Sequence, residues 1–260
     1  MSFNYLKSAR KVVCIGRNYA AHIKELNNPT PKQPFYFLKP TSSIVTPVET
    51  DDIIPRNETE SVTYAGLRAD GSNPGPIYIP KGVKVHHEVE LALIMGRNVS
   101  NATPESVQAD DVYDLISGVA LALDLTARNV QDEAKAKGLP WSIGKGFDSF
   151  LPISDFIPKS QLSRDDFQNS FRLTCSVNNK GRQDGTTDLM LNPLHAIIQH
   201  ISSTMSLEPG DIVLTGTPAG VGEIGPGDTI KSALYQNGKL LTSFKFDCKS
   251  RPGPYVFHET

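Results

Sequence analysis

The stretch His-His-Glu-Val-Glu-Leu-Ala-Leu-Ile-Met-Gly at residues 86–96 constrains the fold more than any other part of the chain. Its apolar and β-branched residues, closed by a glycine, predict a β-strand. Because side chains alternate between the two faces of a strand, Glu88 and Glu90 point the same way. Apolar residues continue on both faces, with Ala92 and Ile94 beyond the glutamates and Val89, Leu91, Leu93 and Met95 opposite them. The pattern predicts a buried strand with two carboxylates at its N-terminal end.

A second apolar run, Val-Ala-Leu-Ala-Leu-Asp-Leu at residues 119–125, adds a third carboxylate. In a strand, Asp124 shares its face with Ala120 and Ala122, whose small side chains leave room beside it. Burying like charges is costly unless a cation neutralises them. Three carboxylates at strand ends therefore indicate a site for a hard divalent cation, Mg²⁺ or Mn²⁺ before Ca²⁺. The alternative is an edge strand whose Glu-x-Glu pairs with surface lysine or arginine.

Two histidines precede these glutamates. His86 shares the facing of Glu88 and Glu90 and could add a nitrogen ligand, which would favour a transition metal. His87 faces the other way and is expected to be packed or hydrogen-bonded.

The composition limits the classes of partner. The 260 residues suffice for one large domain or two small ones. A net charge of −2 and a pI of about 6.3, without a basic stripe, argue against nucleic acid and an anionic membrane surface. No apolar run approaches the roughly 18 residues that cross a bilayer. The three cysteines are odd in number and widely spaced, and we interpret them as reduced core thiols of a cytosolic or matrix protein: Cys14, Cys175 and Cys248.

Residues 1–10 form a lead-in to the first expected strand, at residues 11–16. Lys7, Arg10 and Lys11 precede any acidic residue. This segment is either a short mitochondrial presequence or a basic approach to the strand.

A helix is expected over residues 20–26, where His22 and Glu25 are three residues apart and therefore neighbours on one face. A carboxylate beside an imidazole raises its basicity and orients it for activating water. The following segment, rich in proline, asparagine and lysine, indicates a lid at about residues 18–33. An exposed helix with a chance pair is the alternative.

A second helix is expected at residues 127–137, with Thr126 as its cap and Gly138 beyond its end. Arg128 and Gln131 lie on one face of its first turns, where they could bind an anionic ligand or simply be solvated. Lys145 stands between two glycines, where it could approach a ligand or cover a loop.

The remaining chain predicts further strands at residues 35–40, 171–178, 211–215 and 233–246, the last with a hairpin turn at Asn237-Gly238. Further helices are expected from Thr103 to about residue 117 and over residues 192–204. Residues 50–84 are irregular and could contain a hairpin. The glycine-rich loop at 215–222 lacks the lysine of a phosphate-binding loop, but its N–H groups and the Thr217 hydroxyl could hold a carboxylate.

Seven motifs in order, over about residues 11–247, resemble the fumarylacetoacetate hydrolase family. They are Gly16-Arg17-Asn18-Tyr19 with His22 and Glu25, Phe37-Leu38-Lys39-Pro40, His87-Glu88-Val89-Glu90, Leu123-Asp124-Leu125-Thr126-Ala127-Arg128, Lys137-Gly138-Leu139-Pro140-Trp141, Gly210-Asp211 and the loop from Thr215 to Gly222. The resemblance is to a short, single-domain branch that acts in mitochondria on acylpyruvates and oxaloacetate.

The resemblance implies a fold and a set of site residues. The fold would be α+β and β-rich, a mixed β-roll or sandwich with a few peripheral helices, spanning residues 11–260 as one catalytic domain and forming a homodimer. Glu88, Glu90 and Asp124 would bind Mg²⁺, with Mn²⁺ as a substitute. His22, Glu25 and Lys145 would be catalytic, and the substrate would be bound by Arg17, Tyr19, Arg128, Gln131 and Thr217. Mitochondrial matrix is the implied location, with cytosol as the alternative.

The sequence departs from the pattern of the family it resembles at Asn129, where close relatives usually have aspartate, and in a longer excursion at about residues 57–82. The first would affect substrate preference and the second would lie outside the metal site.

The ligand set implies a chemistry. A 2-oxo acid could chelate Mg²⁺ through its carboxylate and keto oxygens, which would stabilise an enolate. From there the outcomes are tautomerisation or decarboxylation of oxaloacetate, or hydrolysis of an acylpyruvate. The alternatives are an isomerase or hydratase of unsaturated 2-oxo diacids, or a non-catalytic metal- and carboxylate-binding module.

Overall fold

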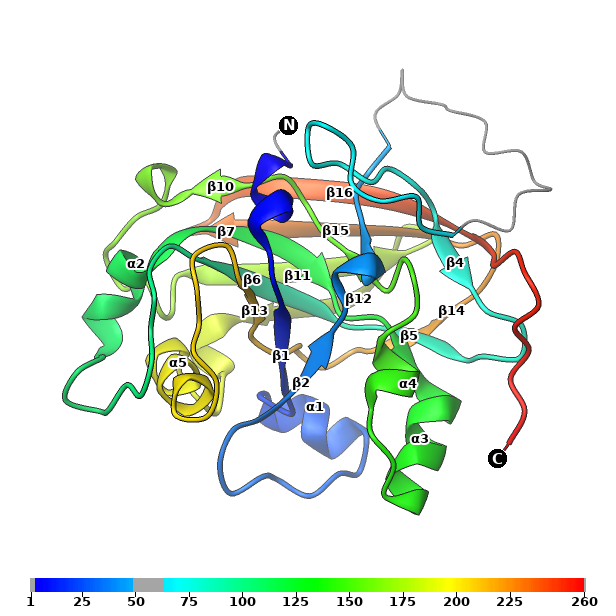
Figure 1. Cartoon of the computed structure of the whole chain (residues 1–260), viewed down its shortest axis with the longest axis horizontal. Helices are drawn as coiled ribbons and strands as arrows, with labels where there is room; N and C mark the ends of the chain where they lie inside the picture. Colours follow the sequence, from blue (N-terminus) through cyan, green and yellow to red (C-terminus); the bar gives the residue numbers. More distant parts are fainter. Residues whose placement is uncertain (1–2, 49–62, 260) are drawn as a thin grey trace.

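The computed structural model describes residues 3–48 and 63–259, and its central element is a mixed six-stranded sheet (Figure 1). The sheet runs in the order β10 (Ile157–Pro158), β7 (Ile116–Leu123), β6 (Val89–Met95), β13 (Ile212–Leu214), β1 (Val12–Gly16) and β2 (Phe35–Lys39). β1 and β13 are parallel and the other neighbours are antiparallel. The predicted β-rich α+β fold is confirmed.

A five-stranded sheet packs against one face of the first. Its order is β12 (Lys180–Thr186), β11 (Phe171–Val177), β15 (Thr229–Gln236), β16 (Lys239–Ser250) and β4 (Ile77–Ile79). β11 contacts β6, and β15 and β16 contact β7. The β15–β16 turn at Asn237-Gly238 has positive φ at both residues, as the sequence predicts, and the two strands extend beyond the expected range.

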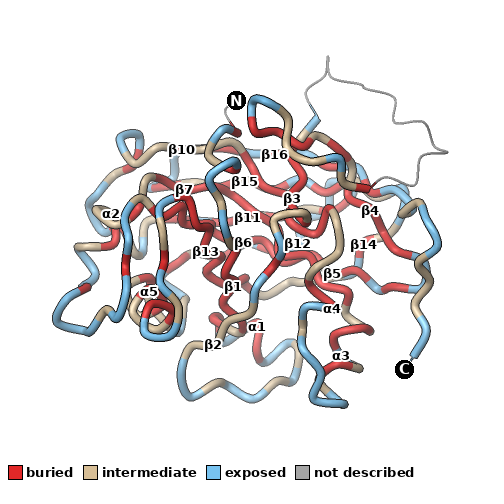
Figure 2. The backbone as a smooth tube through the Cα atoms, viewed as in Figure 1, coloured by how far each residue is buried: buried red, intermediate tan, exposed pale blue. Residues whose placement is uncertain are grey.

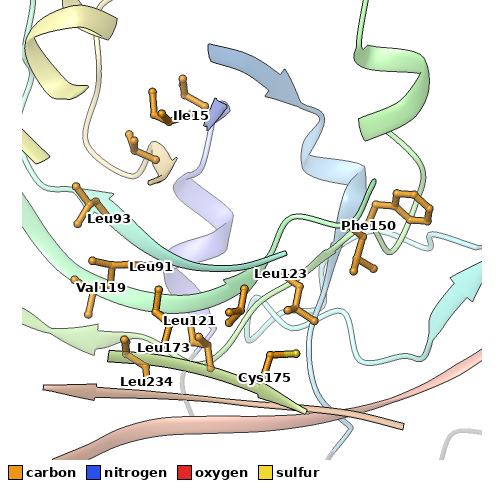
Figure 3. Close-up of a cluster of buried hydrophobic side chains, with 14 of the residues drawn as sticks. Ile15, Leu91, Leu93, Val119, Leu121, Leu123, Phe150, Leu173, Cys175 and Leu234 are labelled. Atoms are coloured by element: carbon orange, nitrogen blue, oxygen red, sulfur yellow. The ribbon is translucent and has the colours of Figure 1, made fainter. Parts of the chain in front are cut away.

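The main core lies between these sheets (Figure 3). β6 contributes Leu91 and Leu93 to it, together with Val89 and Met95, whereas Ala92 and Ile94 belong to a second cluster on the opposite face. The predicted division of this strand between two buried faces is therefore confirmed, and Figure 2 shows β6, β13 and β1 buried along their lengths.

Two small sheets and short helices complete the fold. The sheets are β14 (Gly222–Ile224), β5 (Val85–His87) and β8 (Thr126–Ala127), and β3 (Ile44–Val45) with β9 (Leu151–Pro152). The α-helices are α1 (Ala20–Glu25), α2 (Val112–Leu115), α3 (Arg128–Lys137), α4 (Ser142–Lys145) and α5 (Leu194–Ser202). The 3-10 helices are η1 (Asn4–Ser8), η2 (Thr41–Ser43), η3 (Ala109–Asp111), η4 (Lys159–Gln161) and η5 (Thr187–Leu189). α1, α3 and α4 gather at one edge of the molecule in Figure 1.

The strand predicted over residues 86–96 is broken at Glu88. β5 pairs with β14 and β8, whereas β6 pairs with β7 and β13 in the six-stranded sheet. The two halves join different sheets, so Glu88 lies between them and outside both ladders.

Two local predictions were wrong. The helix expected from Thr103 to residue 117 is reduced to η3 and α2, and it ends early because Ile116 already pairs with Met95 in the sheet. Thr126 does not cap α3, because its hydroxyl donates to the Glu88 carboxylate at 3.0 Å; Ala127 is the cap residue. Lys145, for which the sequence left two alternatives open, ends the short helix α4.

The irregular segment before β5 contains no hairpin within its described residues 63–84, where β4 pairs in parallel with the distant β16. The part of the longer excursion at residues 57–62 lies outside the described residues, as do residues 1 and 2 of the lead-in. The rest of the lead-in is ordered around η1 and buries Phe3 and Leu6. Among the helices of the described ranges, none is long and apolar enough to cross a membrane.

Candidate metal and substrate site

The three predicted carboxylates converge at the break between β5 and β6. Glu88 occupies the break, Glu90 lies on β6, and Asp124 follows β7 directly. The Asp124 N–H donates to the Glu88 carbonyl at 2.8 Å, and Glu90 is paired with Ala122, whose small side chain leaves space beside it. One carboxylate oxygen from each residue lies within 4.8 Å of the others, and all three side chains are buried.

Two of these carboxylates are neutralised by buried cations. The Lys145 ammonium lies 3.0 Å from Glu88 and 2.8 Å from Asp124, and Arg128 donates to Glu88 at 2.6 Å. Burial opposes ionisation of Glu88, but Lys145 and Arg128 outweigh it and hold its pKa well below the ordinary value. Burial likewise disfavours the Lys145 ammonium, but Asp124 and Glu88 raise its pKa overall. Lys145 is therefore charged at neutral pH, and its ammonium donates hydrogen bonds to both carboxylates.

Glu90 lacks such a cation. Its carboxylate accepts a hydrogen bond from the Gly216 N–H at 2.7 Å and forms no ion pair with any residue that the structure describes. Burial, and then the charges of Asp124 and Glu88, raise its pKa well above the ordinary value. An under-neutralised cluster of hard oxygen donors is the environment that a divalent ion such as Mg²⁺ or Mn²⁺ would stabilise. These residues therefore fit the predicted metal.

His86 is not part of this carboxylate group. Its Nδ1 accepts a hydrogen bond from Arg128 Nε at 3.4 Å, and burial together with Arg128 lowers its pKa to about 4. The expectation of a nitrogen ligand fails because β5, which carries His86, belongs to a different sheet from β6. His87 is completely buried and hydrogen-bonded to Gln183, as its facing predicted.

Lys39, at the end of β2, is a site residue to which the sequence assigned no role. Its fully buried ammonium lies 3.0 Å from the Asp124 carboxylate and donates to the carbonyls of Leu125, Lys145 and Phe150 at 2.6–2.9 Å. It therefore connects the segments that carry Asp124 and Lys145. The sequence feature that could have identified Lys39 is a lysine at the end of an apolar run and directly before a proline.

The cavity above the carboxylates is lined by residues from widely separated parts of the chain, including Arg17, His22, Arg128, Gln131, Lys135, Trp141, Lys145 and Thr217. A larger hollow of about 610 Å³ lies over β11, β12 and β15, but Asp184 is the single acidic residue in its lining. The smaller cavity is the candidate site because the carboxylate cluster forms its floor.

α1 brings the predicted pair to the rim of this cavity. His22 is buried, and its Nδ1 lies 3.7 Å from the Glu25 carboxylate, which is too long for a hydrogen bond. Glu25 instead accepts hydrogen bonds from the Gly220 N–H at 3.1 and 3.2 Å. Burial lowers the pKa of His22, which keeps its imidazole neutral and able to accept a proton.

One face of α3 lines the cavity from floor to mouth. Arg128, Gln131 and Lys135 follow one another at helical spacing, and Arg128 donates to the Gln131 side chain at 2.7 Å. Lys135 was not predicted, although this spacing places it on the same face. Its ammonium lies 5.5 Å from the Trp141 ring centroid and 3.2 Å from Asp132.

The other predicted substrate residues differ in placement. Arg17 lines the cavity with its guanidinium 5.6 Å from the centroid of the Phe35 ring. Tyr19 is buried outside the cavity lining, and its hydroxyl has no hydrogen-bond partner among the described residues. The Thr217 hydroxyl donates to the Val89 carbonyl at 2.8 Å.

Asn129, the residue that departs from the family pattern, faces away from the cavity. Its side chain accepts from the Lys84 N–H at 3.1 Å and donates to the Gly82 carbonyl at 2.9 Å.

This chain is similar to known proteins in both sequence and structure. Residues 11–245 match the family described as "Fumarylacetoacetate (FAA) hydrolase C-terminal". The mitochondrial oxaloacetate tautomerase of Saccharomyces cerevisiae is 62% identical over the whole of both chains.

Two solved structures extend the comparison. A yeast protein of the fumarylacetoacetate hydrolase family superposes with a TM-score of 0.89 at 60% identity, covering 99% of this chain and 100% of that chain. The fumarylpyruvate hydrolase of Pseudomonas aeruginosa, in complex with Mn²⁺ and pyruvate, gives a TM-score of 0.73 at 28% identity, covering 93% and 90%.

Proposed function

Because this chain belongs to the fumarylacetoacetate hydrolase family, we propose that it is a Mg²⁺-dependent enzyme that acts on oxaloacetate and related 2,4-dioxo acids. Its reactions would be keto–enol tautomerisation of oxaloacetate and cleavage of the C–C bond, by decarboxylation of oxaloacetate or hydrolysis of acylpyruvates. The observation that carries the proposal is the buried cluster of Glu88, Glu90 and Asp124 beneath a cavity lined by cations. The name of the 62% identical yeast relative supports oxaloacetate as a substrate.

The carboxylate cluster would hold the divalent ion. When bound, Mg²⁺ or Mn²⁺ supplies Lewis-acid stabilisation of negative charge on the 2-oxo group of the substrate. The Mn²⁺ and pyruvate in the fumarylpyruvate hydrolase structure support a metal ion and a 2-oxo acid as ligands of this fold.

The cations around the cluster would bind the substrate and move protons. Arg128 and Gln131 would orient the substrate carboxylate at the floor, where Arg128 already contacts Glu88. Lys145, which its neighbours keep in the ammonium form, would stabilise the negative charge that develops when C3 loses a proton to water. In the reverse step it would donate its own proton to C3 and regain one from water. Arg17 would bind from the rim.

His22 and Glu25 would activate water for hydrolysis. The neutral imidazole can accept a proton from water, and a carboxylate beside it would orient the ring. The 3.7 Å separation needs only a small movement of α1 to become a hydrogen bond, which suits a lid at about residues 18–33 that closes over the substrate. Tautomerisation does not need this water.

The charges in the cavity favour a dianion. Arg17, Arg128, Lys135 and Lys145 line it opposite the three carboxylates, and a divalent ion would add two positive charges. A substrate with two carboxylates, such as oxaloacetate, would neutralise this excess better than a monoanionic acylpyruvate. Lys135, two helical turns above Arg128, would contact the distal carboxylate.

The mitochondrial matrix is the proposed location and a homodimer the proposed assembly, with residues 11–260 as a single catalytic domain. The mitochondrial name of the yeast relative supports the location.

A panel of three substrates tests this function. Oxaloacetate, acetylpyruvate and a dienoic diacid are assayed with Mg²⁺ and after chelation. We expect turnover of oxaloacetate or acetylpyruvate that chelation abolishes. Reaction with the diene alone would indicate an isomerase or hydratase, silence on all three would indicate a binding module, and activity that survives chelation would refute the metal site.

A further inference from the structure

One buried side chain, Gln183 of β12, connects the two parts of the backbone that support the carboxylate cluster. It lies on the edge strand of the five-stranded sheet and is 2% exposed. Its carbonyl oxygen accepts from the Val89 N–H at 3.1 Å and contacts His87 Nδ1 at 2.9 Å. Its amide nitrogen donates to the Thr217 hydroxyl and the Pro218 carbonyl, both at 2.8 Å. All four hydrogen-bonding positions of the amide are therefore used.

These partners lie beside two metal ligands. His87 and Val89 flank Glu88 at the break between β5 and β6. Thr217 follows Gly216, whose N–H donates to Glu90 at 2.7 Å. Gln183 thus links the backbone that follows Glu88 and the imidazole that precedes it to the loop that binds Glu90.

The same loop is packed directly on β12. A Cβ atom at Gly220 would lie 2.0 Å from the Arg182 carbonyl oxygen, and one at Gly185 would lie 2.5 Å from Pro218 Cβ. The Gly220 N–H is also the donor to Glu25. Because no side chain fits between loop and strand, the position of the loop depends on β12 and on the bonds of Gln183.

The bonds also fix the tautomer of His87. The Val89 N–H can only donate and the Pro218 carbonyl can only accept, so the amide of Gln183 cannot be flipped. Its oxygen therefore faces His87 Nδ1, which must carry the proton to avoid opposing lone pairs at 2.9 Å. Cys175 Sγ, 3.7 Å from the same nitrogen, is a second and weaker partner, and a thiol proton donated to that nitrogen would leave the Gln183 oxygen facing a lone pair. The bare Nε2 has no hydrogen-bond partner among the described residues, which is consistent with an acceptor and not with a buried N–H.

We propose that Gln183 is a positioning residue, which holds the Glu88 backbone and the 216–220 loop together so that the carboxylates converge, and which sets His87 as the Nδ1–H tautomer. The metal part of this inference rests on the proposed function. Groups that orient metal ligands in this way typically change metal affinity by 10- to 100-fold when removed.

The test compares Gln183→Met with Gln236→Met. Gln236 of β15 is a matched control, because it is also buried in the five-stranded sheet and makes three hydrogen bonds, to Ser163 and Ser170, which do not line the carboxylate cavity. Mn²⁺ affinity is measured by electron paramagnetic resonance, without substrate, and Tm is measured for each variant. We expect both variants to lose Tm, but only Gln183→Met to bind Mn²⁺ at least 10-fold more weakly.

A second variant and a spectroscopic measurement complete the design. Gln183→Glu retains an oxygen opposite His87 and Val89 but loses both donors, so it should also weaken Mn²⁺ binding, and it replaces Gln183→Met if that variant does not fold. In the unsubstituted protein, ¹⁵N correlation spectra of the histidine rings should show His87 protonated at Nδ1, assigned by loss of its signal in His87→Gln.

Three outcomes would overturn the inference. They are Mn²⁺ affinity within twofold of normal in the folded Gln183 variant, an equal loss of affinity in Gln236→Met, and His87 protonated at Nε2. Failure of the unsubstituted protein to bind Mn²⁺ would instead overturn the proposed function, and with it the metal part of this inference.

Discussion

Replacement of Lys145 by methionine tests the electrostatic design of the site. The ammonium lies 2.8 Å from Asp124 and 3.0 Å from Glu88, and its side chain is 2% exposed. Methionine keeps most of the length and apolar contact of the lysine stem but removes the charge. Without a divalent ion, the two carboxylates then lose the cation that they share.

The loss of folding stability in Lys145→Met depends on the charges that remain around the two carboxylates. Removing one member of a buried ion pair destabilises a protein by about 3–5 kcal/mol. Arg128 still contacts Glu88 and Lys39 still contacts Asp124, so we expect the lower end of this range, about 3 kcal/mol. For a chain of this size that corresponds to a fall in Tm of roughly 6–12 °C.

The assay is thermal unfolding with EDTA and with excess Mg²⁺. Lys145 repels a divalent ion bound to its neighbours, so Lys145→Met should bind Mg²⁺ more tightly and gain more Tm from it than the unsubstituted protein. Lys137→Met is the control, because that exposed lysine pairs with Glu133 at 2.8 Å and should cost at most about 1 kcal/mol. Equal Tm values for the two variants in EDTA, or an equal Mg²⁺ shift in Lys145→Met and the unsubstituted protein, would refute the reasoning.

Four further predictions concern catalysis. Asp124→Asn should abolish Mg²⁺ binding in a calorimetric titration together with activity; retained binding would contradict the ligand assignment. His22→Ala should lower acetylpyruvate hydrolysis, followed as pyruvate release, by about 10²–10⁴-fold. Ketonisation of enol-oxaloacetate, followed by absorbance, should fall much less, and equal losses would make His22 the shared proton carrier. Burial lowers the pKa of His22, so its imidazole stays neutral, and able to act as a base, down to a pH below about 6.5. The rate of hydrolysis should therefore begin to fall only below that pH, and a fall that begins above it would contradict the role of His22 as the general base. Lys135→Gln should reduce kcat/KM for oxaloacetate about 3- to 10-fold more than kcat/KM for acetylpyruvate, because it removes a partly exposed ion pair with the distal carboxylate of oxaloacetate. Lys137→Gln should leave the ratio of the two kcat/KM values unchanged.

The alternation of side chains between the two faces of a strand was enough to predict that three carboxylates form the floor of the cavity. Glu88, Glu90 and Asp124 could be placed together because a strand fixes which side chains share a face, and the alanines beside Asp124 indicated space. The same alternation could not predict that the strand breaks at Glu88, because the break arises from pairing of β5 with β14, which is distant in sequence.

Local helix signals failed where tertiary bonds competed with them. Thr126 has the chemistry of a cap, but its hydroxyl binds Glu88, and the helix expected after Thr103 gives way to a strand whose Ile116 pairs with Met95. Helix propensity and capping contribute about 1 kcal/mol per residue or less in most cases, which a buried hydrogen bond or sheet ladder can override.

The residues that sequence reasoning missed act through partners far along the chain. Lys39 reaches carbonyls 86–111 residues away, and Gln183 bonds to residues 34–96 positions distant. No local period marks a side chain whose partners are backbone groups of other strands, so a buried lysine or glutamine resembles any other polar residue in a strand. The carboxylates carry the chemistry in their residue type, whereas the residues that hold them in place become visible only when the strands are assembled. For this site, the candidate ligands can therefore be selected from sequence, and the geometry that would make them bind an ion cannot.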